Sequence, residues 1–256
     1  MKRIVLIGAG RVARAVFSAF GDRIVGVYNR SLPAAQEMVA RTVVSATDRL
    51  DRLPSDADLY LLAVADEAIQ EMAEKLSHVL PATALLAHTS GATSTDALLP
   101  FARRGIWYPL QSFGSTAVGW SAIPIIIHAT RPEDADRLAQ LAAALGGPPP
   151  QRLDDAQRAR LHVAAVFANN FTNHLYHLAY RLCTERGVDF GLLLPLIRET
   201  AGRLAAATDP AEFQTGPAVR NDGATIKRHL ADLEDQHLRK MYELLTHGIE
   251  RFGTDQ

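Results

Sequence analysis

The stretch Ile4-Val5-Leu6-Ile7-Gly8-Ala9-Gly10-Arg11-Val12-Ala13 decides the fold of this 256-residue chain. Its apolar first half predicts a buried strand, and the Gly-x-Gly-x-x-Ala that follows is a form of the dinucleotide-binding fingerprint. Gly8 permits the tight turn out of the strand, Gly10 lets a pyrophosphate approach the backbone, and the small Ala13 lets the next helix pack closely. That helix would aim its free N–H groups and its dipole at the phosphate. We therefore expect cofactor contacts from Gly8, Gly10, Arg11, Val12 and Ala13.

A second strand at the right distance supports this interpretation. Residues 24–28 are mostly apolar and end in Asn29-Arg30-Ser31, where an NAD-specific site has an acidic residue for the ribose 2′-hydroxyl. A guanidinium suits a 2′-phosphate because it donates paired N–H bonds and stays charged at neutral pH. The alternative is a polar turn with a solvated arginine. We expect Asn29, Arg30 and Ser31 to contact the cofactor, with NADP favoured over NAD.

The composition is that of an ordinary globular protein. A formal net charge of -1 gives no electrostatic argument for a nucleic-acid or membrane partner. Cys183 is the single cysteine, which excludes an intrachain disulfide and any all-cysteine metal site and fits a reducing cytoplasm. We therefore expect a cytoplasmic protein that acts on a small molecule.

The next buried strand, residues 59–64, should end beside the cofactor. In an open α/β sheet, ligands lie beyond the carboxyl ends of the strands, so Ala63, Val64 and Asp66 are expected there. A simpler role for Asp66 is to cap the helix that follows.

A further strand at residues 84–87 ends in His88-Thr89-Ser90-Gly91-Ala92, where a nicotinamide and its substrate would meet. His88 could donate a proton, because the unperturbed pKa of histidine lies near neutrality, and it would also border the cofactor. Ser90 and the Gly91 amide could hold a carbonyl oxygen or a carboxylate. The alternative is a capped turn with no substrate contact.

The first half of the chain closes with two strands and a helix. Residues 105–112 predict a strand with aromatic residues that either wall a pocket or belong to the core. Residues 123–128 are β-branched, and Pro124 suggests a strand that begins at an edge. A helix at 132–145 leads to the Gly- and Pro-rich segment 146–150, so we expect a dinucleotide-binding domain at 1–150 and a second domain at 151–256.

The second domain is predicted to be all-helical, with helices at 156–186, 192–207 and one or two at 222–252. Residues 161–182 are apolar nearly all round, which predicts burial in the domain or at a subunit contact. This helix nevertheless carries two neighbouring polar stripes, His162, Val166, Asn169 and Asn173 on one and Asn170, His174 and His177 on the other.

These polar stripes have three interpretations. They form a structural network, contact the cofactor or substrate, or bind a metal through His174 and His177. No acidic residue or cysteine lies nearby at helical spacing, so we expect no metal. Further along, Arg220 follows a Gly-Pro turn and could bind a substrate carboxylate or pair with an acid such as Glu199.

Taken together, these motifs resemble a bacterial family of Rossmann-like NADP oxidoreductases whose C-terminal part is a domain of unknown function. That family is related to the 6-phosphogluconate dehydrogenase and β-hydroxyacid dehydrogenase superfamily and to pyrroline-carboxylate reductases. The resemblance covers essentially the whole chain and implies an α/β Rossmann domain followed by an all-α domain that forms homodimers. It rests on the glycine fingerprint, His88-Thr-Ser-Gly-Ala92, Pro109-Leu-Gln-Ser112, Phe167-Ala-Asn-Asn-Phe-Thr-Asn-His-Leu-Tyr176 and Gln214-Thr-Gly-Pro-Ala-Val-Arg220.

One position departs from the pattern of the β-hydroxyacid dehydrogenases. Their catalytic lysine lies on the first long interdomain helix, one turn before an asparagine, and the matching residue before Asn170 is Val166. None of the four lysines, Lys2, Lys75, Lys227 and Lys240, lies on that helix. Reduction of an imine needs less proton help, because the substrate can arrive protonated, so an imine or carbonyl reductase that uses His88 or Ser90 is favoured, unless Lys227 or Lys240 reaches the site from elsewhere.

The sequence thus supports two hypotheses. The first is an NADP-dependent oxidoreductase that transfers a hydride between the nicotinamide and a small carbonyl, imine or hydroxy compound. Its expected catalytic residues are His88, Ser90 and Asn170, and its expected substrate-binding residues are Ser90, Gly91, Gln111, Asn169, Asn173, His174 and Arg220. The second is a dinucleotide-binding protein without turnover, such as a redox sensor or an assembly subunit.

Overall fold

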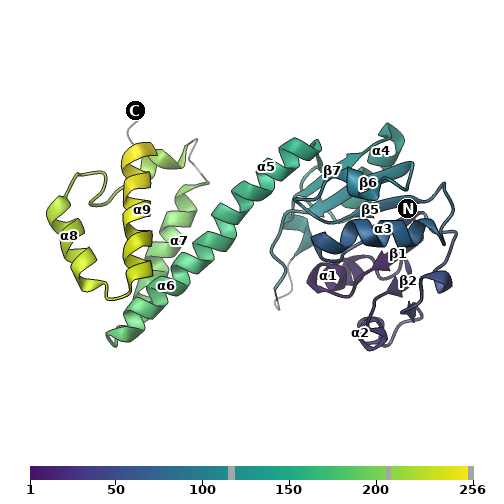
Figure 1. Cartoon of the computed structure of the whole chain (residues 1–256), viewed down its shortest axis with the longest axis horizontal. Helices are drawn as coiled ribbons and strands as arrows, with labels where there is room; N and C mark the ends of the chain where they lie inside the picture. Colours follow the sequence, from purple (N-terminus) through teal and green to yellow (C-terminus); the bar gives the residue numbers. More distant parts are fainter. Residues whose placement is uncertain (115–118, 206–208, 253–256) are drawn as a thin grey trace. The chain divides into compact units, whose positions relative to one another are not determined.

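The computed structural model describes residues 1–114, 119–205 and 209–252 (Figure 1). The chain divides into two compact units, Met1–Leu175 and Tyr176–Gln256. This division lies beyond the boundary expected at residue 150, because a strand and a helix that follow residue 150 pack with the first unit. Among the described residues, no helix has both the length and the apolar character needed to span a membrane.

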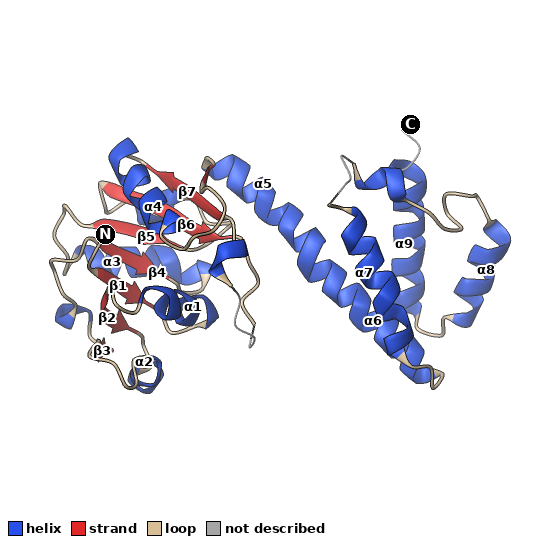
Figure 2. Ribbon diagram, turned by 180° about the vertical axis from the view of Figure 1, so that it is seen from behind, coloured by secondary structure: helices blue, strands red, loops and turns tan. Residues whose placement is uncertain are grey.

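The first unit is built on an eight-stranded sheet with the order β3-β2-β1-β4-β5-β6-β7-β8 (Figure 2). Strands β1 to β6 run parallel, β7 is antiparallel to β6, and β8 is parallel to β7. The reversal of strand order on the two sides of β1 confirms the Rossmann fold. The strands are β1 (Ile4–Ile7), β2 (Ile24–Tyr28), β3 (Ser45–Thr47), β4 (Leu59–Leu62), β5 (Leu85–His88), β6 (Arg103–Pro109), β7 (Ile125–Ala129) and β8 (Gln151–Arg152).

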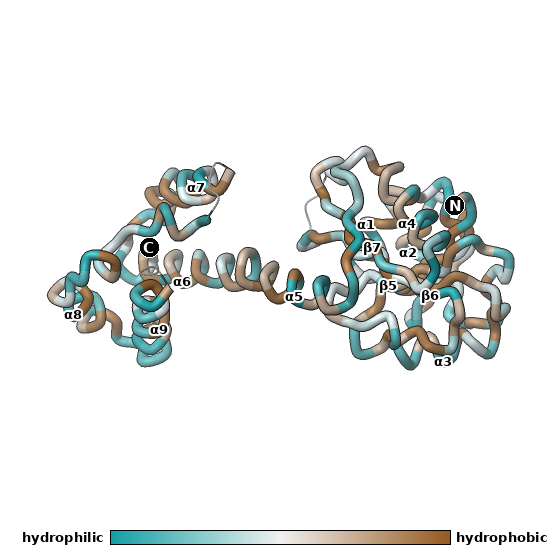
Figure 3. Tube along the Cα trace, turned by 90° about the horizontal axis from the view of Figure 1, so that it is seen from above, coloured by the Kyte–Doolittle hydropathy of each residue, from teal (hydrophilic) through white to brown (hydrophobic). Residues whose placement is uncertain are grey.

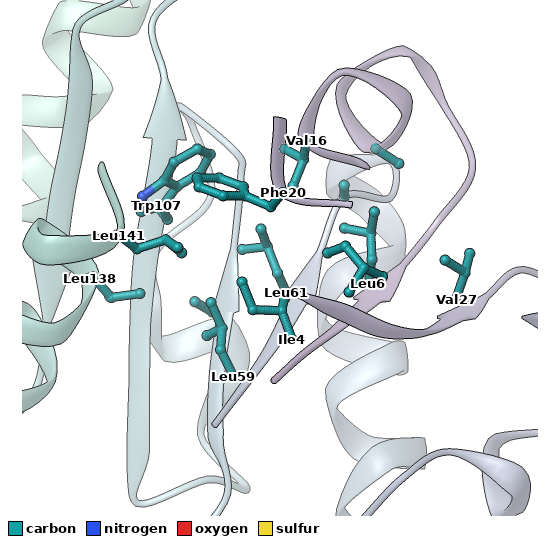
Figure 4. Packing of buried hydrophobic residues seen from close by; sticks show 14 of the residues in the cluster. Ile4, Leu6, Val16, Phe20, Val27, Leu59, Leu61, Trp107, Leu138 and Leu141 are labelled. Atoms are coloured by element: carbon teal, nitrogen blue, oxygen red, sulfur yellow. The ribbon is translucent and has the colours of Figure 1, made fainter. Parts of the chain in front are cut away.

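Helices cover both faces of this sheet. Helices α1 (Arg11–Phe20), α2 (Leu32–Met38) and α4 (Pro132–Ala143) contribute to one apolar core, and α3 (Ile69–Ser77) contributes to the other. In the first core Phe20 of α1 meets Trp107 of β6 edge to face, with ring centroids 5.9 Å apart (Figure 4). Alternate residues of the central strands β1 and β4 belong to the two cores, as the period of two requires.

Two details of the sheet differ from the sequence expectation. The β-branched pair Val43-Val44 favours a short strand, and the structure has it slightly later, as β3 at Ser45–Thr47. Pro124 precedes β7, but β7 is not an edge strand, because β8 pairs with its far side. Proline has no N–H to donate to a neighbouring strand. Because Pro124 lies just before β7, no hydrogen bond between the strands is lost.

The long helix expected at 156–186 consists of three segments. They are α5 (Asp155–Ala165), a π-helical segment at Val166–Phe171, and α6 (Thr172–Glu185). The later helices are α7 (Leu194–Arg203), α8 (Gly223–Asp232) and α9 (Gln236–Phe252). Residues 206 and 207, the expected end of the helix at 192–207, lie outside the described residues.

The burial expected for residues 161–182 is not found within this chain. None of the described residues of α6, α7, α8 and α9 is buried, and hydrophobic and hydrophilic stretches alternate along these helices (Figure 3). Several large apolar side chains are exposed, among them Leu192, Leu196, Leu244 and Leu245.

Candidate functional site

The loop after β1 has the geometry of a phosphate-binding turn. Gly8 has a φ of +116°, and a Cβ there would lie 2.3 Å from the Ala63 carbonyl oxygen, so only glycine fits. Gly10 is the residue that precedes α1, and a Cβ at Gly10 would meet no atom of residues 1–114, 119–205 or 209–252 within 4 Å. Within the described part of the chain no side chain caps α1, which leaves its first N–H groups available to a ligand. Ala13 is buried in the core between α1 and the sheet, and Arg11 and Val12 occupy the first turn of α1.

The end of β2 carries the expected polar turn. The Asn29 amide side chain donates to the Ser31 carbonyl at 3.1 Å, and the Asn29 backbone N–H donates to Thr47 at 3.1 Å. Arg30 and Ser31 are exposed, and Ser31 precedes α2 without making a side-chain capping bond. The turn is thus fixed by Asn29, while the guanidinium and the hydroxyl face outward.

Residues at the end of β4 lie beside the glycine loop. The Ala63 carbonyl and the Val64 side chain are the nearest neighbours of a Cβ built on Gly8. Asp66 is exposed and begins a short 3-10 turn whose preceding residue is Ala65, with no side-chain capping bond. The prediction that Asp66 caps a helix is therefore wrong.

His88 is fully buried at the end of β5. Its Nδ1 accepts the Ser90 backbone N–H at 3.1 Å, so the neutral ring carries its proton on Nε2. Among the described residues, Nε2 has no hydrogen-bond partner of normal geometry. Burial lowers the pKa of His88 to about 4, and the charge of Arg158 adds to this effect, whereas the Ser94 backbone opposes it.

The pKa of His88 corrects the sequence argument, which assumed a value near neutrality. At neutral pH the ring is uncharged. It can donate a hydrogen bond from Nε2, but it is not an imidazolium with a proton to give.

The Ser90 hydroxyl organises the turn that follows His88. Its oxygen accepts the N–H groups of Ala92 at 3.1 Å and Thr93 at 2.9 Å, and it lies 3.0 Å from the Thr93 hydroxyl. Ser90 is also nearly inaccessible, at 6% exposure. The capped-turn interpretation therefore describes the conformation of this segment.

Arg158, a buried arginine that the sequence analysis does not name, connects the turn after β5 to α5. Arg158 donates to the carbonyl oxygens of Gly91 and Thr93 and to the Asp155 carboxylate. Asp155 in turn accepts the Ser94 hydroxyl at 2.6 Å and the Thr95 backbone N–H at 2.9 Å. Burial alone would raise the pKa of Asp155, but these donors outweigh it and hold that pKa well below its usual range.

Gly91 lies against a pair of aromatic side chains. The Tyr108 hydroxyl, at the end of β6, is 3.2 Å from Nδ1 of His162 on α5. A Cβ on Gly91 would lie 2.5 Å from that nitrogen and 2.7 Å from Cζ of Tyr108, so a side chain there would displace the pair. Burial raises the pKa of Tyr108, and Asp66 acts in the same direction.

The structure therefore brings together the ends of β1, β4, β5 and β6 with the start of α5, all within the first unit. The expected residues Asn169 and Asn170 lie exposed in the π-helical segment of the same long helix, and Asn173 and His174 follow at the start of α6. Gln111 is exposed, and its side-chain oxygen accepts the Ser112 N–H. Such π-helical segments are frequent at functional sites.

Arg220 belongs to the second unit, and the acid proposed for it has another partner, since Glu199 pairs with Arg203 at 3.0 Å. No group of three or more potential metal ligands is present in the described part of the chain.

Sequence reasoning missed Arg158, Asp155 and the role of Tyr108. Arg158 has the spacing of a solvated helix arginine, and only the packing of α5 against the turn after β5 shows otherwise. A partial signal was present, because Asp154 and Gln157 form a capping box that marks the start of α5.

Comparisons with known proteins agree with this architecture. Residues 2–111 match the model of a Rossmann-like domain, and residues 123–249 match a domain of unknown function, DUF2520. No match is found among curated proteins.

Among solved structures, a proposed NADP oxidoreductase from Bacteroides fragilis is 36% identical, with a TM-score of 0.88 and 98% of each chain covered. A pyrroline-5-carboxylate reductase from Coxiella burnetii is 19% identical, with a TM-score of 0.60 and coverage of 99% of this chain and 98% of that one. A reductive aminase from Aspergillus terreus, in complex with NADPH and ethyl levulinate, is 16% identical, with a TM-score of 0.69 and coverage of 98% and 95%. The last two similarities show the fold.

At 36% identity over nearly the full length, the Bacteroides protein is a relative of this chain. The chain belongs to the family in which a Rossmann-like domain is followed by the domain of unknown function DUF2520.

Proposed function

We propose that this protein is an NADP-dependent oxidoreductase. The observation that carries the proposal is the open space beside Gly10 at the uncapped start of α1, together with the exposed Arg30 at the end of β2. The first feature suits a pyrophosphate, and the second suits a 2′-phosphate. Bound NADPH would supply a hydride, and the protein would orient the nicotinamide and the substrate at the carboxyl ends of β4, β5 and β6.

The proposed substrate is a small carbonyl or imine compound, or the corresponding hydroxy compound. The names of two similar structures, a pyrroline-5-carboxylate reductase and a reductive aminase, support reduction of a C=N or C=O bond. His88 would donate a hydrogen bond from its unpartnered Nε2 to the cofactor or the substrate. Gly91, Gln111 and the exposed asparagines of the π-helical segment are proposed substrate contacts. Asn173 and His174 are proposed from their place on the polar stripes of the long helix, and Arg220 because a guanidinium suits a substrate carboxylate.

A second copy of this chain is the proposed partner, bound through the helical region. Its support is the set of exposed leucines on α7 and α9, which is unusual for a monomer surface. Light scattering on the purified protein tests this, and a monomer at micromolar concentration would contradict it. We also propose a cytoplasmic location, which the single cysteine supports.

One observation favours a second candidate function, nucleotide binding without turnover. His88 is neutral and buried, and the Ser90 hydroxyl is engaged in its own turn, so neither is a ready proton donor. A redox sensor or an assembly subunit would need no such donor.

Thermal unfolding with NADP, NADPH, NAD and NADH at matched concentrations tests the cofactor proposal. A ligand at 100 times its dissociation constant adds about 2.7 kcal/mol to the folded state, which raises the Tm by roughly 5–10 °C for a chain of this size. We expect this rise with the phosphorylated pair. A rise with none of the four would contradict nucleotide binding. NADPH oxidation with pyrroline-5-carboxylate and with ethyl levulinate then separates the enzyme from the sensor.

A further inference from the structure

Reduction of a carbonyl needs a proton as well as a hydride. The hydride goes to carbon, and the oxygen that takes the electron pair of the broken π bond must receive a proton. His88 is closed to solvent and uncharged, and the Ser90 oxygen is surrounded by the donors of its own turn. Neither side chain is a ready donor of that proton, whereas other titratable groups lie near the carboxyl ends of the same strands.

His162 is placed for this task. It lies on α5 against Gly91, the third residue after β5, and His162 as a residue is partly exposed, unlike the fully buried His88. Its Nδ1 is 3.2 Å from the Tyr108 hydroxyl, and the two rings meet edge to face with centroids 6.0 Å apart. Three strand ends converge here, since Gly91 follows β5, Tyr108 lies on β6, and Asp66 after β4 acts electrostatically on Tyr108.

We propose that His162 is the proton-transfer residue of this protein and that Tyr108 positions it through Nδ1. The proposal rests on the oxidoreductase function proposed above. In the reductive direction, bound NADPH would supply the hydride that the carbonyl carbon receives as the C=O π bond breaks. The oxygen takes a proton from Nε2 of the His162 imidazolium, and the neutral imidazole then regains a proton from water.

Tyr108 is a positioning residue in this scheme. Its hydroxyl is held beneath the Gly91 turn, at 9% exposure for the whole residue, so it is poorly placed to reach a substrate itself. The hydrogen bond between the Tyr108 hydroxyl and Nδ1 leaves Nε2 as the nitrogen that exchanges protons. The aspartate of a Ser-His-Asp triad orients its histidine in the same way. Gly91 contributes by leaving room for both rings.

A pair of probes isolates the proton step. Ethyl levulinate has a ketone that needs one proton on reduction, whereas the N-methyl-1-pyrrolinium ion accepts a hydride and becomes a neutral amine with no proton transfer. In single-turnover experiments with NADPH, we expect His162→Gln to slow reduction of the ketone about 100-fold and to leave reduction of the iminium ion within about threefold. Tyr108→Phe should show the same selectivity with a smaller loss of about tenfold.

The chain contains a matched control. Tyr242 and His229 form a second tyrosine–histidine pair in the helical unit, with the hydroxyl 2.8 Å from Nδ1 and ring centroids 5.8 Å apart. Tyr242→Phe and His229→Gln should change neither reaction. NADPH affinity and Tm should also stay close to wild type in His162→Gln, which excludes loss of binding or folding.

A readout without cofactor tests the positioning role. In the nucleotide-free protein, the ¹⁵N shift of His162 Nδ1 should change in Tyr108→Phe and stay constant in Tyr242→Phe. An unchanged shift would overturn the role of Tyr108. Equal slowing of both probes by His162→Gln, or slowing of neither, would overturn proton transfer by His162 while leaving the oxidoreductase intact. A wild-type protein that binds NADPH but reduces neither probe would overturn the proposed function, and this inference with it.

Discussion

The Nε–H of Arg158 donates to the carbonyl oxygen of Gly91 at 3.2 Å, although 67 positions separate the two residues in the chain. Arg158 is completely buried, and the same guanidinium also binds Thr93 and Asp155. This relationship ties the turn after β5 to the start of α5, and it makes the candidate site depend on residues from both sides of the Gly- and Pro-rich segment 146–150.

Arg158→Met should therefore destabilise the protein by about 2–4 kcal/mol, because it leaves one buried and one partly buried carbonyl without their donor and removes the charged partner of Asp155. Urea unfolding at pH 7.5 measures the change. The control is Arg152→Met, which removes an exposed pair with Asp136 and should cost less than about 1 kcal/mol. Equal losses in the two variants would contradict the anchoring role.

Gly91→Ala should disturb the Tyr108–His162 pair, because the new Cβ would lie 2.5 Å from the His162 ring and must push it away. We expect a loss of about 1–3 kcal/mol in unfolding free energy. Gly202→Ala is the opposite case, since that glycine lies in α7 with nothing within 4 Å of an added Cβ. Helix propensity predicts that this control stabilises the protein by up to about 1 kcal/mol.

The two glycines of the fingerprint should respond differently to alanine. The methyl group of Gly10→Ala meets no atom of the described residues within 4 Å, so the apo protein should keep its Tm. NADPH affinity should fall at least about tenfold, because the methyl group would face the phosphates. Gly8→Ala clashes with the Ala63 carbonyl at a φ of +116° and should unfold at a clearly lower temperature. Calorimetry and fluorescence titration with NADPH measure both. Unchanged affinity in Gly10→Ala would place the phosphates elsewhere.

Arg30→Asp should weaken NADPH binding about 10- to 100-fold and change NADH binding much less, because it replaces paired donors by a like charge beside the 2′-phosphate. Arg131→Asp makes the same change in net charge after β7. Because β7 runs antiparallel to β6, its carboxyl end lies on the side of the sheet away from the carboxyl ends of the parallel strands. This control should leave both affinities unchanged. Equal weakening of NADPH and NADH in Arg30→Asp would contradict the assignment.

His88 should make stability depend on pH in a defined window. Its pKa is lowered to about 4 in the folded state, so the unfolded chain, with a value near 6.5, binds more protons between these two values. The stabilising contribution is complete above pH 6.5 and is lost as the pH falls toward 4. Between pH 7.5 and pH 5 the wild type should lose about 2 kcal/mol more than His88→Gln. Equal losses in urea unfolding would show that His88 is not held neutral.

Local signals were sufficient for the nucleotide-binding half of the fold. The run before Gly8 and the strand that ends at Asn29 depend on neighbouring residues, so their pattern is visible in the chain itself. In the helical unit, Asp222 was likewise expected to begin a helix, and its carboxylate accepts the Thr225 N–H at 3.0 Å.

The candidate site was harder to predict because its decisive contacts link distant segments. The pKa of His88 depends on burial and on Arg158, neither of which its neighbours in sequence reveal. The apolar character of residues 161–182 predicted burial, but it cannot tell contacts within the chain from contacts with another molecule. Which partner covers an apolar helix is a property of the assembly and not of local pattern.

The position of α5 in the chain also sets an order of events during synthesis. The strands β1 to β6 leave the ribosome before Asp155 and Arg158 are synthesised. The turn at residues 89–95 therefore forms its hydrogen bonds to these two residues only after α5 has been made. Pulse proteolysis of fragments ending at residues 150 and 165 would reveal this as cleavage within the turn of the shorter fragment alone. The part of the protein nearest the proposed chemistry would then be the last part of its domain to mature.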